Sequence, residues 1–283
     1  HPVLTFELET FMVQTPPHWR DKSKDDWLQT KAWAYGQAVT LRAVMARLAA
    51  RAYKRSAPGW PEFADFDCFA CHREIRNVKS MYYVRPSQAE QRRGRTWRLR
   101  ESDAKWQPTA RQESGLQGMP GVPPWDKSQY LILRQLVKEV APDAQTPLDG
   151  ALQEVEEAMA RVGMSDPARV AAAANRVVTL LDTDIMPKLP AARFNAQHTL
   201  KLLQNISGDG TAIARTGVFA AEQAFMSLQA LYVNYRRRVK RDDYKAIDDM
   251  FRQAYDTLQD HTSYSAKAFE GHLRQLNEVF TKP

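Results

Sequence analysis

Two cysteines three positions apart, followed at once by a histidine, are the residues of this chain whose types and spacing can do chemistry. They form the run Cys68-Phe69-Ala70-Cys71-His72. Two such thiols can form thioethers with the vinyl groups of one porphyrin, and the adjacent imidazole then binds the iron. A zinc site needs four ligands, and the chain has no third cysteine. A thioredoxin-like pair would follow a strand and precede a helix, a pattern absent here. The motif therefore predicts one covalent haem c held by Cys68 and Cys71, with His72 as the proximal iron ligand.

The remaining composition is that of a globular protein. Of the 283 residues, 43% are hydrophobic, so the chain can bury a substantial core without disulfide bonds. The first residues lack the basic region and apolar run of a signal peptide, which predicts a mature or truncated form. No stretch is apolar enough to predict a membrane span. Because haem is attached to such motifs outside the cytoplasm, we expect a periplasmic or extracellular protein.

The positive charge is concentrated after the motif. The formal net charge is +7, and residues 73–113 hold eleven Lys and Arg against five Asp and Glu. On charge alone this segment would predict nucleic-acid binding. After a haem motif we expect instead partners for the haem propionates or a docking face for an acidic redox protein, and no nucleic-acid partner. A solvated loop without a specific role remains the alternative.

The elements before and after the motif must position it. A short amphipathic helix, with Leu4, Leu8, Phe11 and Met12 on one face, and a long helix over about 26–54 are expected to form an antiparallel hairpin. The apolar face predicted for the long helix is Ala34, Ala38, Leu41, Met45, Leu48 and Ala52, and its candidate caps are Ser23 and Asp25. This hairpin returns His1 toward the motif and leaves His18 nearer the far turn. Residues 73–125 have no sustained periodicity, which favours an irregular segment wrapped around a haem.

From residue 128 onward the pattern is helical throughout. Helices are predicted at 128–140, 147–162, 167–186, 193–205, 211–241, 242–260 and 263–281, with Thr146 and Asp166 as N-caps. Connections are short and each helix has an apolar stripe, which predicts an antiparallel helical bundle. The fold class is therefore all-α, with a haem c domain at 1–126 and a bundle domain at 127–283.

Several stretches together resemble a known family. They are His1-Pro2-x-Leu4-x-Phe6-Glu7, Pro17-His18-Trp19, and Trp60-Pro61-Glu62-Phe63-x-x-Phe66-Asp67 directly before the motif. They are similar to the C-terminal part of multihaem c-type cytochromes related to the tetrahaem electron carriers of hydroxylamine oxidation, and Glu222-Gln223 is similar to their helical tail. The resemblance implies electron transfer and His1 as a haem ligand. Either further haems belong to a missing region or partner subunit, or this chain is a member reduced to one haem. This chain has one haem motif where the family has several, and Arg73 stands where relatives often have a second histidine.

The sixth iron ligand decides between functions. A histidine or methionine would make an electron carrier, whereas an empty position would permit gas binding or peroxide chemistry. His1 is the first candidate for the distal ligand and His18 the second; Met81 and Met119 are further candidates. His198, His261 and His272 are expected to be surface or interhelix hydrogen-bonding residues.

We expect a non-catalytic electron carrier whose partners are an acidic redox protein or other cytochrome subunits. Two alternatives remain open. One is a five-coordinate haem enzyme or gas sensor, and the other is an assembly module that carries one haem within an oligomer or larger complex.

Overall fold

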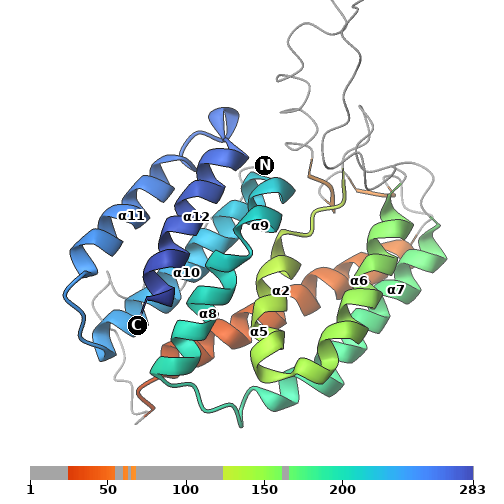
Figure 1. The fold of residues 1–283 in the computed structure, drawn as a ribbon. Coiled ribbons are helices and arrows are strands. Elements are labelled where there is room, and N and C mark those ends of the chain that lie inside the picture. Colours follow the sequence, from red (N-terminus) through yellow and green to blue (C-terminus); the bar gives the residue numbers. More distant parts are fainter. Residues whose placement is uncertain (1–24, 55–59, 63–64, 68–123, 161–165, 283) are drawn as a thin grey trace, which may run out of the picture.

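The computed structural model describes residues 25–54, 60–62, 65–67, 124–160 and 166–282 (Figure 1). Every regular element in these ranges is a helix, which confirms the all-α fold class. The longer helices are α2 (Leu28–Tyr53), α5 (Ser128–Val140), α6 (Gln145–Met159), α7 (Pro167–Leu180), α8 (Ala196–Gly208), α9 (Gly210–Thr216), α10 (Val218–Arg238), α11 (Tyr244–Asp256) and α12 (Ala266–Thr281). The helix predicted at residues 4–12, and the hairpin it would form, lie outside the described residues.

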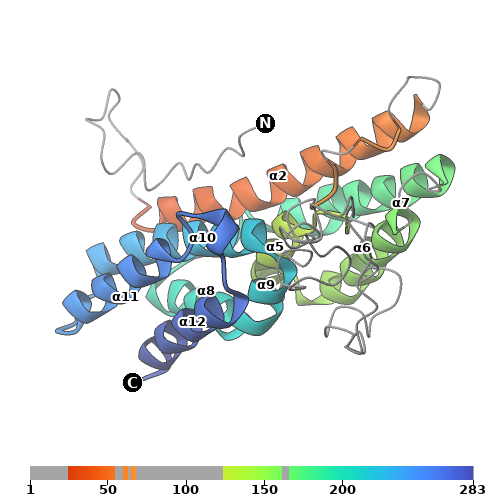
Figure 2. The ribbon, with the colours of Figure 1, turned by 90° about the horizontal axis from the view of Figure 1, so that it is seen from above.

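Helix α2 joins the two sides of the bundle. It packs against α7 and α5 on one side and against α10 on the other, and Figure 2 shows it running along one edge of the molecule. The predicted inner face is confirmed, since Ala34, Ala38, Leu41, Met45, Leu48 and Ala52 are all buried. A buried polar contact fixes its position, because Asn234 of α10 donates a hydrogen bond of 2.7 Å to Thr30 of α2. Each side of the bundle is therefore packed against the same long helix.

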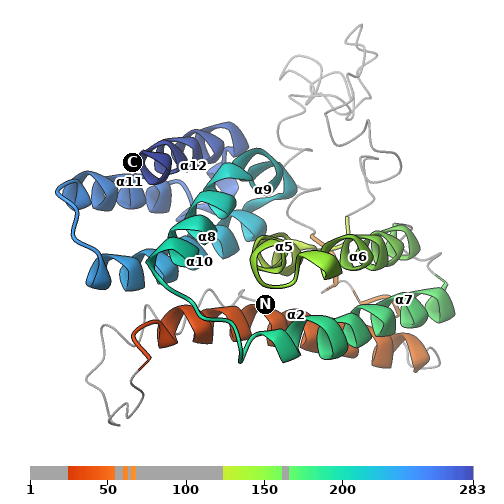
Figure 3. The ribbon, with the colours of Figure 1, turned by 60° about the horizontal axis from the view of Figure 1, so that its bottom comes forward.

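The other helices form two groups. Helix α6 packs on α7, while α8 and α9 pack between α10 and α12, and α11 packs on α12 (Figures 1 and 3). Helix α5 lies between the groups, in contact with α2, α8 and α10. The core is continuous through both groups, from Leu148 and Val177 on one side to Phe269 and Phe280 on the other. The described helices thus form one hydrophobic core.

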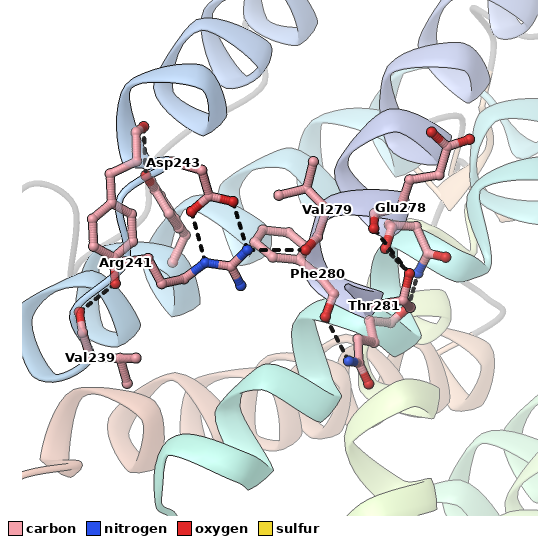
Figure 4. Close-up of polar contacts among 11 residues, drawn as sticks. Val239, Arg241, Asp243, Glu278, Val279, Phe280 and Thr281 are labelled. Carbon is pink, nitrogen blue, oxygen red and sulfur yellow. Dashed lines mark hydrogen bonds and ion pairs between the residues drawn. The ribbon is translucent and has the colours of Figure 1, made fainter. Parts of the chain in front are cut away.

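The turn between α10 and α11 is tied to the C-terminal helix (Figure 4). The Arg241 guanidinium binds both carboxylate oxygens of Asp243, at 2.8 and 2.7 Å, and also donates to the carbonyl of Val279, at 3.2 Å. This guanidinium is only partly exposed, so bonds to a carboxylate and a carbonyl replace much of its hydration. The hydroxyl of Tyr244 donates to the carbonyl of Val239 and closes the same turn. Helix α11 is therefore held beside α12 at both its packed face and its first turn.

Several predicted helix boundaries are confirmed. Helix α5 has the predicted bounds, and Asp166 caps α7 by accepting a hydrogen bond of 3.0 Å from the amide of Ala168. The helical backbone continues beyond α7 through a π-turn at Leu181–Ile185 and a 3₁₀ turn at Met186–Lys188. The start predicted near residue 26 is not confirmed, because α2 begins at Leu28 with Trp27 at its N-cap position and no side-chain cap. The Asp25 carboxylate accepts from the amide of Trp27 at 2.9 Å one turn earlier, so Asp25 is not the cap, and Ser23 lies outside the described residues.

Other boundary predictions are wrong. Helix α6 begins at Gln145 after a 3₁₀ turn at Pro142–Ala144, so Thr146 is not its cap. Pro147 is tolerated within the first turn, where its missing N–H has no helical partner to lose. The single helix predicted at 211–241 is two helices, α9 and α10, divided at Gly217 with φ +151°. An L-residue rarely adopts this backbone angle, which ends α9 and turns the chain into α10.

Other helix starts lie two or three residues after their predicted positions. Helix α8 begins at Ala196 because the Asn195 side chain caps it, accepting from the amide of His198 at 2.9 Å. Helix α12 begins at Ala266, capped by Ser265 in the same way. The division into domains 1–126 and 127–283 stays a prediction, although α2 shares its core with the helices after residue 127. None of the described helices is long and apolar enough to cross a membrane.

Candidate functional site

The residues directly before the Cys-x-x-Cys-His motif are joined to residues that lie far along the chain. Phe66 and Trp125 form an antiparallel bridge. On either side of this pair, the Asp67 amide donates to the Pro124 carbonyl at 2.8 Å, and the Asp126 amide donates to the Asp65 carbonyl at 3.0 Å. We call residues 65–67 and 124–126 the loop base, because they are the described residues on either side of residues 68–123. The segment that contains the motif therefore starts and ends at one place.

The loop base belongs to the hydrophobic core. Phe66 and Trp125 are 5% and 4% exposed, and both lie in the same apolar cluster as the helices. Burying two aromatic side chains stabilises this pairing by several kcal/mol, of the order of 2 to 3 kcal/mol for each ring. Asp126 also accepts a hydrogen bond from the amide of Ser128 at 2.9 Å, which links the base directly to the start of α5. The two ends of the segment are thus fixed relative to the bundle.

Arg51, in the last turn of α2, binds Asp65 of the loop base. Its guanidinium lies 3.1 Å from Oδ1 of Asp65 and 2.7 Å from Oε2 of Glu62. Burial raises the pKa of the Asp65 carboxyl above its ordinary value, and the attraction of Arg51 only partly opposes that rise. Among the described residues, Oδ2 of Asp65 has no hydrogen-bond partner. An arginine and a buried carboxylate therefore hold the end of α2 against the residues that precede the motif.

Asp67, the neighbour of Cys68, is packed against the junction of α9 and α10. It is 3% exposed, and a Cβ atom placed on Gly217 would lie 2.5 Å from its Oδ2. Only glycine leaves room for this carboxylate. The position is also at the start of α10, where the helix dipole favours negative charge. The residue directly before Cys68 is therefore buried beside the first turn of α10.

Glu222, in the first turns of α10, is paired with a histidine from the turn before α12. Nε2 of His261 lies 2.6 Å from Oε1 of Glu222, which is 8% exposed, and the His261 ring makes an edge contact with Phe219. His261 begins the 3₁₀ turn His261–Ser263 before α12, so the pair joins α10 to that turn. The prediction that His261 is an interhelix hydrogen-bonding residue is confirmed. Its partner Glu222 was known from the sequence only through the family resemblance.

The predicted ligands themselves fall outside the described residues. Cys68, Cys71, His72, His1 and His18 lie there, as do Met81 and Met119. His198 is exposed on α8, and His272 of α12 is partly exposed. Within the described ranges, no three His, Cys, Asp or Glu side chains are grouped so that they could hold a metal ion.

Sequence reasoning missed the loop base, Arg51 and Gly217. Residues 65–67 and 124–126 are each too short to show a strand period, and they pair across a long separation. The one local signal was Gly217 within an otherwise helical pattern, since glycine inside a predicted helix often marks an interruption.

The anchored base fits a chain that holds a covalent haem. Two thioethers and an imidazole supply the bonds of such a group, and all three donors lie within five residues. A covalently bound porphyrin keeps a fixed position only if the chain beside its attachment point is fixed. Here the residue before Cys68 is buried and hydrogen-bonded. No family model, no curated protein and no solved structure matches this chain. Its function must therefore be inferred from its residues and their geometry.

Proposed function

We propose that this chain is a c-type cytochrome that carries single electrons through one haem bonded to Cys68 and Cys71, with His72 as the proximal ligand. The observation that carries the proposal is the spacing of these three residues, Cys-x-x-Cys-His. When bound, the haem supplies an iron that cycles between two oxidation states and so accepts and returns one electron. Membership of the multihaem family, further haems and a periplasmic or extracellular location belong to the same proposal.

The chain contributes position and charge to this activity. The thiols tether the group, and the loop base fixes Phe66 and Asp67, the two buried residues directly before the first thiol. The net positive charge of residues 73–113 attracts an acidic redox partner and raises its rate of association, an effect that weakens with added salt. No bond to a substrate is made or broken, so the fold needs rigidity near the tether rather than a catalytic group.

Covalent attachment is tested by the intact mass of protein matured in a periplasm that attaches haem. The full chain is expected to exceed its polypeptide mass by one haem and to keep its pigment on a denaturing gel. The double variant Cys68→Ser and Cys71→Ser is expected to lose the pigment while keeping its helical circular dichroism. His198→Ala is the matched control, because His198 is exposed on α8, and it should keep the pigment. A pigment that acid and organic solvent extract from the unaltered chain, or no pigment at all, overturns the proposal.

The distal ligand is tested by the optical spectrum. We propose His1, with His18 as the second candidate, so the unaltered chain should show a six-coordinate, low-spin iron. His1→Ala is expected to change this spectrum to a high-spin form that binds carbon monoxide rapidly, whereas His18→Ala should leave it unchanged. The reverse result assigns the ligand to His18. A high-spin spectrum in the unaltered chain would favour the haem enzyme or gas sensor instead.

A further inference from the structure

Among the described residues the fold buries three charged side chains, and all three are carboxylates. Asp65, Asp67 and Glu222 are 7%, 3% and 8% exposed, whereas every described Lys, Arg and His is at least partly exposed. Burying an ionised group is costly, and most charged residues stay at the surface for that reason. Three buried carboxylates in one region therefore favour a functional role over packing.

The three carboxylates lie in the loop base or beside it. Asp65 and Asp67 flank Phe66 within the loop base, and Asp67 packs against Gly217 at the start of α10. Glu222 follows Gly217 by five residues, about 7.5 Å of helix. Figure 1 shows the chain that leads into α5 and the turn before α12, which holds the partner of Glu222, at the same end of the bundle. The buried negative charge is thus concentrated next to the Cys-x-x-Cys-His motif.

The described cations around these carboxylates are more exposed than the carboxylates themselves. Arg51 binds Asp65, yet Oδ2 of this buried side chain has no hydrogen-bond partner among the described residues. Glu222 is paired with His261, which is charged only when protonated. The dipole at the start of α10 favours the ionised form of Asp67. The described part of this region therefore has more negative than positive charge in its buried interior.

We propose that Asp67 and Glu222 lower the reduction potential of the haem, an inference that rests on the proposed function. Asp67 is one peptide bond from Cys68, and consecutive Cα atoms are about 3.8 Å apart, so its carboxylate is close to a porphyrin that this cysteine holds. Oxidised haem carries one more positive charge than reduced haem. A buried negative charge therefore stabilises the oxidised form more than the reduced form, and a low local dielectric strengthens this effect. The electron donor of this chain must then be correspondingly more reducing.

The experiment is a redox titration of the full, haem-bearing chain, followed by its optical spectrum. Asp67→Asn keeps the side-chain shape and removes one charge, so it should favour reduction about tenfold, an increase of about 59 mV for a one-electron couple. Glu222→Gln should raise the potential by a smaller factor, because the first turns of α10 separate Glu222 from Asp67. Asp242→Asn is the matched control: Asp242 is an exposed carboxylate beyond the other end of α10, and this variant should leave the potential unchanged.

Two further comparisons separate an effect of charge from an effect of structure. Glu222→Asp keeps the negative charge, so its potential should stay close to that of the unaltered chain, unlike that of Glu222→Gln. The carboxylates are buried, so the shift caused by Asp67→Asn should persist in high salt, which screens exposed charges. An unchanged optical spectrum in each variant shows that the iron keeps its ligands.

The outcomes distinguish this inference from the proposed function. If the variants keep their covalent haem and neither Asp67→Asn nor Glu222→Gln raises the potential, the inference is wrong and the proposed function stands. Equal potentials in Glu222→Asp and Glu222→Gln, or a shift that disappears in high salt, also overturn it. If Asp67→Asn does not fold, the two Glu222 variants decide the question. A chain without covalent haem overturns both the inference and the proposed function.

Discussion

Asp65 combines a buried carboxyl group with an ion pair that only partly compensates for its burial. Its pKa is raised above the ordinary value near 4 because burial disfavours the charged form more than Arg51 favours it. The native state therefore binds more protons than the unfolded state as the pH rises from about 4 through the raised pKa. Stability from this group is fully present below about pH 4 and is lost across that window. Ionisation of the Asp65 carboxyl therefore destabilises the native state as the pH rises.

Replacing Asp65 with asparagine should consequently stabilise the protein at neutral pH. Asp65→Asn keeps the shape of the side chain and removes the buried charge, while Arg51 retains Glu62 as its partner. The free energy of unfolding, measured with urea, is expected to exceed that of the unaltered chain at pH 7 and to approach it near pH 4. A variant that is less stable at pH 7 by an amount that grows with pH would contradict this account.

Asp182 is the control with the opposite sign. Arg42 lowers the pKa of the Asp182 carboxyl through a hydrogen bond, so this pair stabilises the native state above about pH 4 and loses its effect as the pH falls through the lowered pKa. Asp182→Asn should therefore be less stable than the unaltered chain at pH 7 and equal to it in acid. Because the pair is exposed, the difference should also shrink with added salt.

The junction between α9 and α10 depends on one glycine. Gly217→Ala forces an L-residue to φ +151° and places its Cβ 2.5 Å from the Asp67 carboxylate, so we expect a loss of about 2 to 4 kcal/mol. Gly150→Ala is the matched control: Gly150 is exposed within α6, and a Cβ there meets nothing within 4 Å. That variant should gain up to about 1 kcal/mol, the difference in helix propensity. Thermal and urea unfolding of both proteins measure the contrast, and equal effects would show that Gly217 is not strained.

The local sequence pattern predicted where the helices lie, but often not the residues at which they begin and end. The three-and-four spacing of Leu41, Met45 and Leu48 predicts a buried face without reference to any other segment, and that face is buried. The apolar pattern continues through Gly217, so periodicity alone predicted one helix where the backbone makes two. Thr146 was a reasonable cap by residue type, but the 3₁₀ turn at Pro142–Ala144 starts the helix earlier. Contacts with other segments of the chain decide at which residue such a helix begins or ends.

The same distinction applies to the candidate site. Cys68, Cys71 and His72 are proposed as haem ligands from their spacing alone, because two thioethers and one iron bond would fix the distances between the donors. The loop base could not be recognised in this way. Phe66 and Trp125 become neighbours only through the fold of the whole bundle, and neither stands in a run long enough to predict a strand.

At the scale of the molecule, the described helices form one bundle whose core runs through α2, and the described residues on either side of the motif-bearing segment pair with each other. Because the Asp67 amide bonds to the Pro124 carbonyl, the chain enters and leaves the segment within hydrogen-bonding distance. Closing a shorter loop between the same two points costs less conformational entropy. The cost in free energy falls by about 0.6 kcal/mol for each halving of the loop length. The described helices contact one another across their own core, from α2 to α12. We therefore expect the bundle to be stable without the segment.

Replacing residues 68–123 with a four-residue Gly-Ser linker should therefore leave a folded helical bundle without pigment. The shortened loop is expected to add roughly 2 kcal/mol to the free energy of unfolding, about 0.6 kcal/mol for each halving of its length. Circular dichroism and urea unfolding measure this, and a single cooperative transition is expected. Adding Phe66→Ala to the shortened chain should remove about 3 kcal/mol, because that ring fills the core at the loop base. A shortened chain that does not fold would instead mean that residues 68–123 contribute an essential part of the core, and the bundle would then depend on the same segment that carries the haem motif.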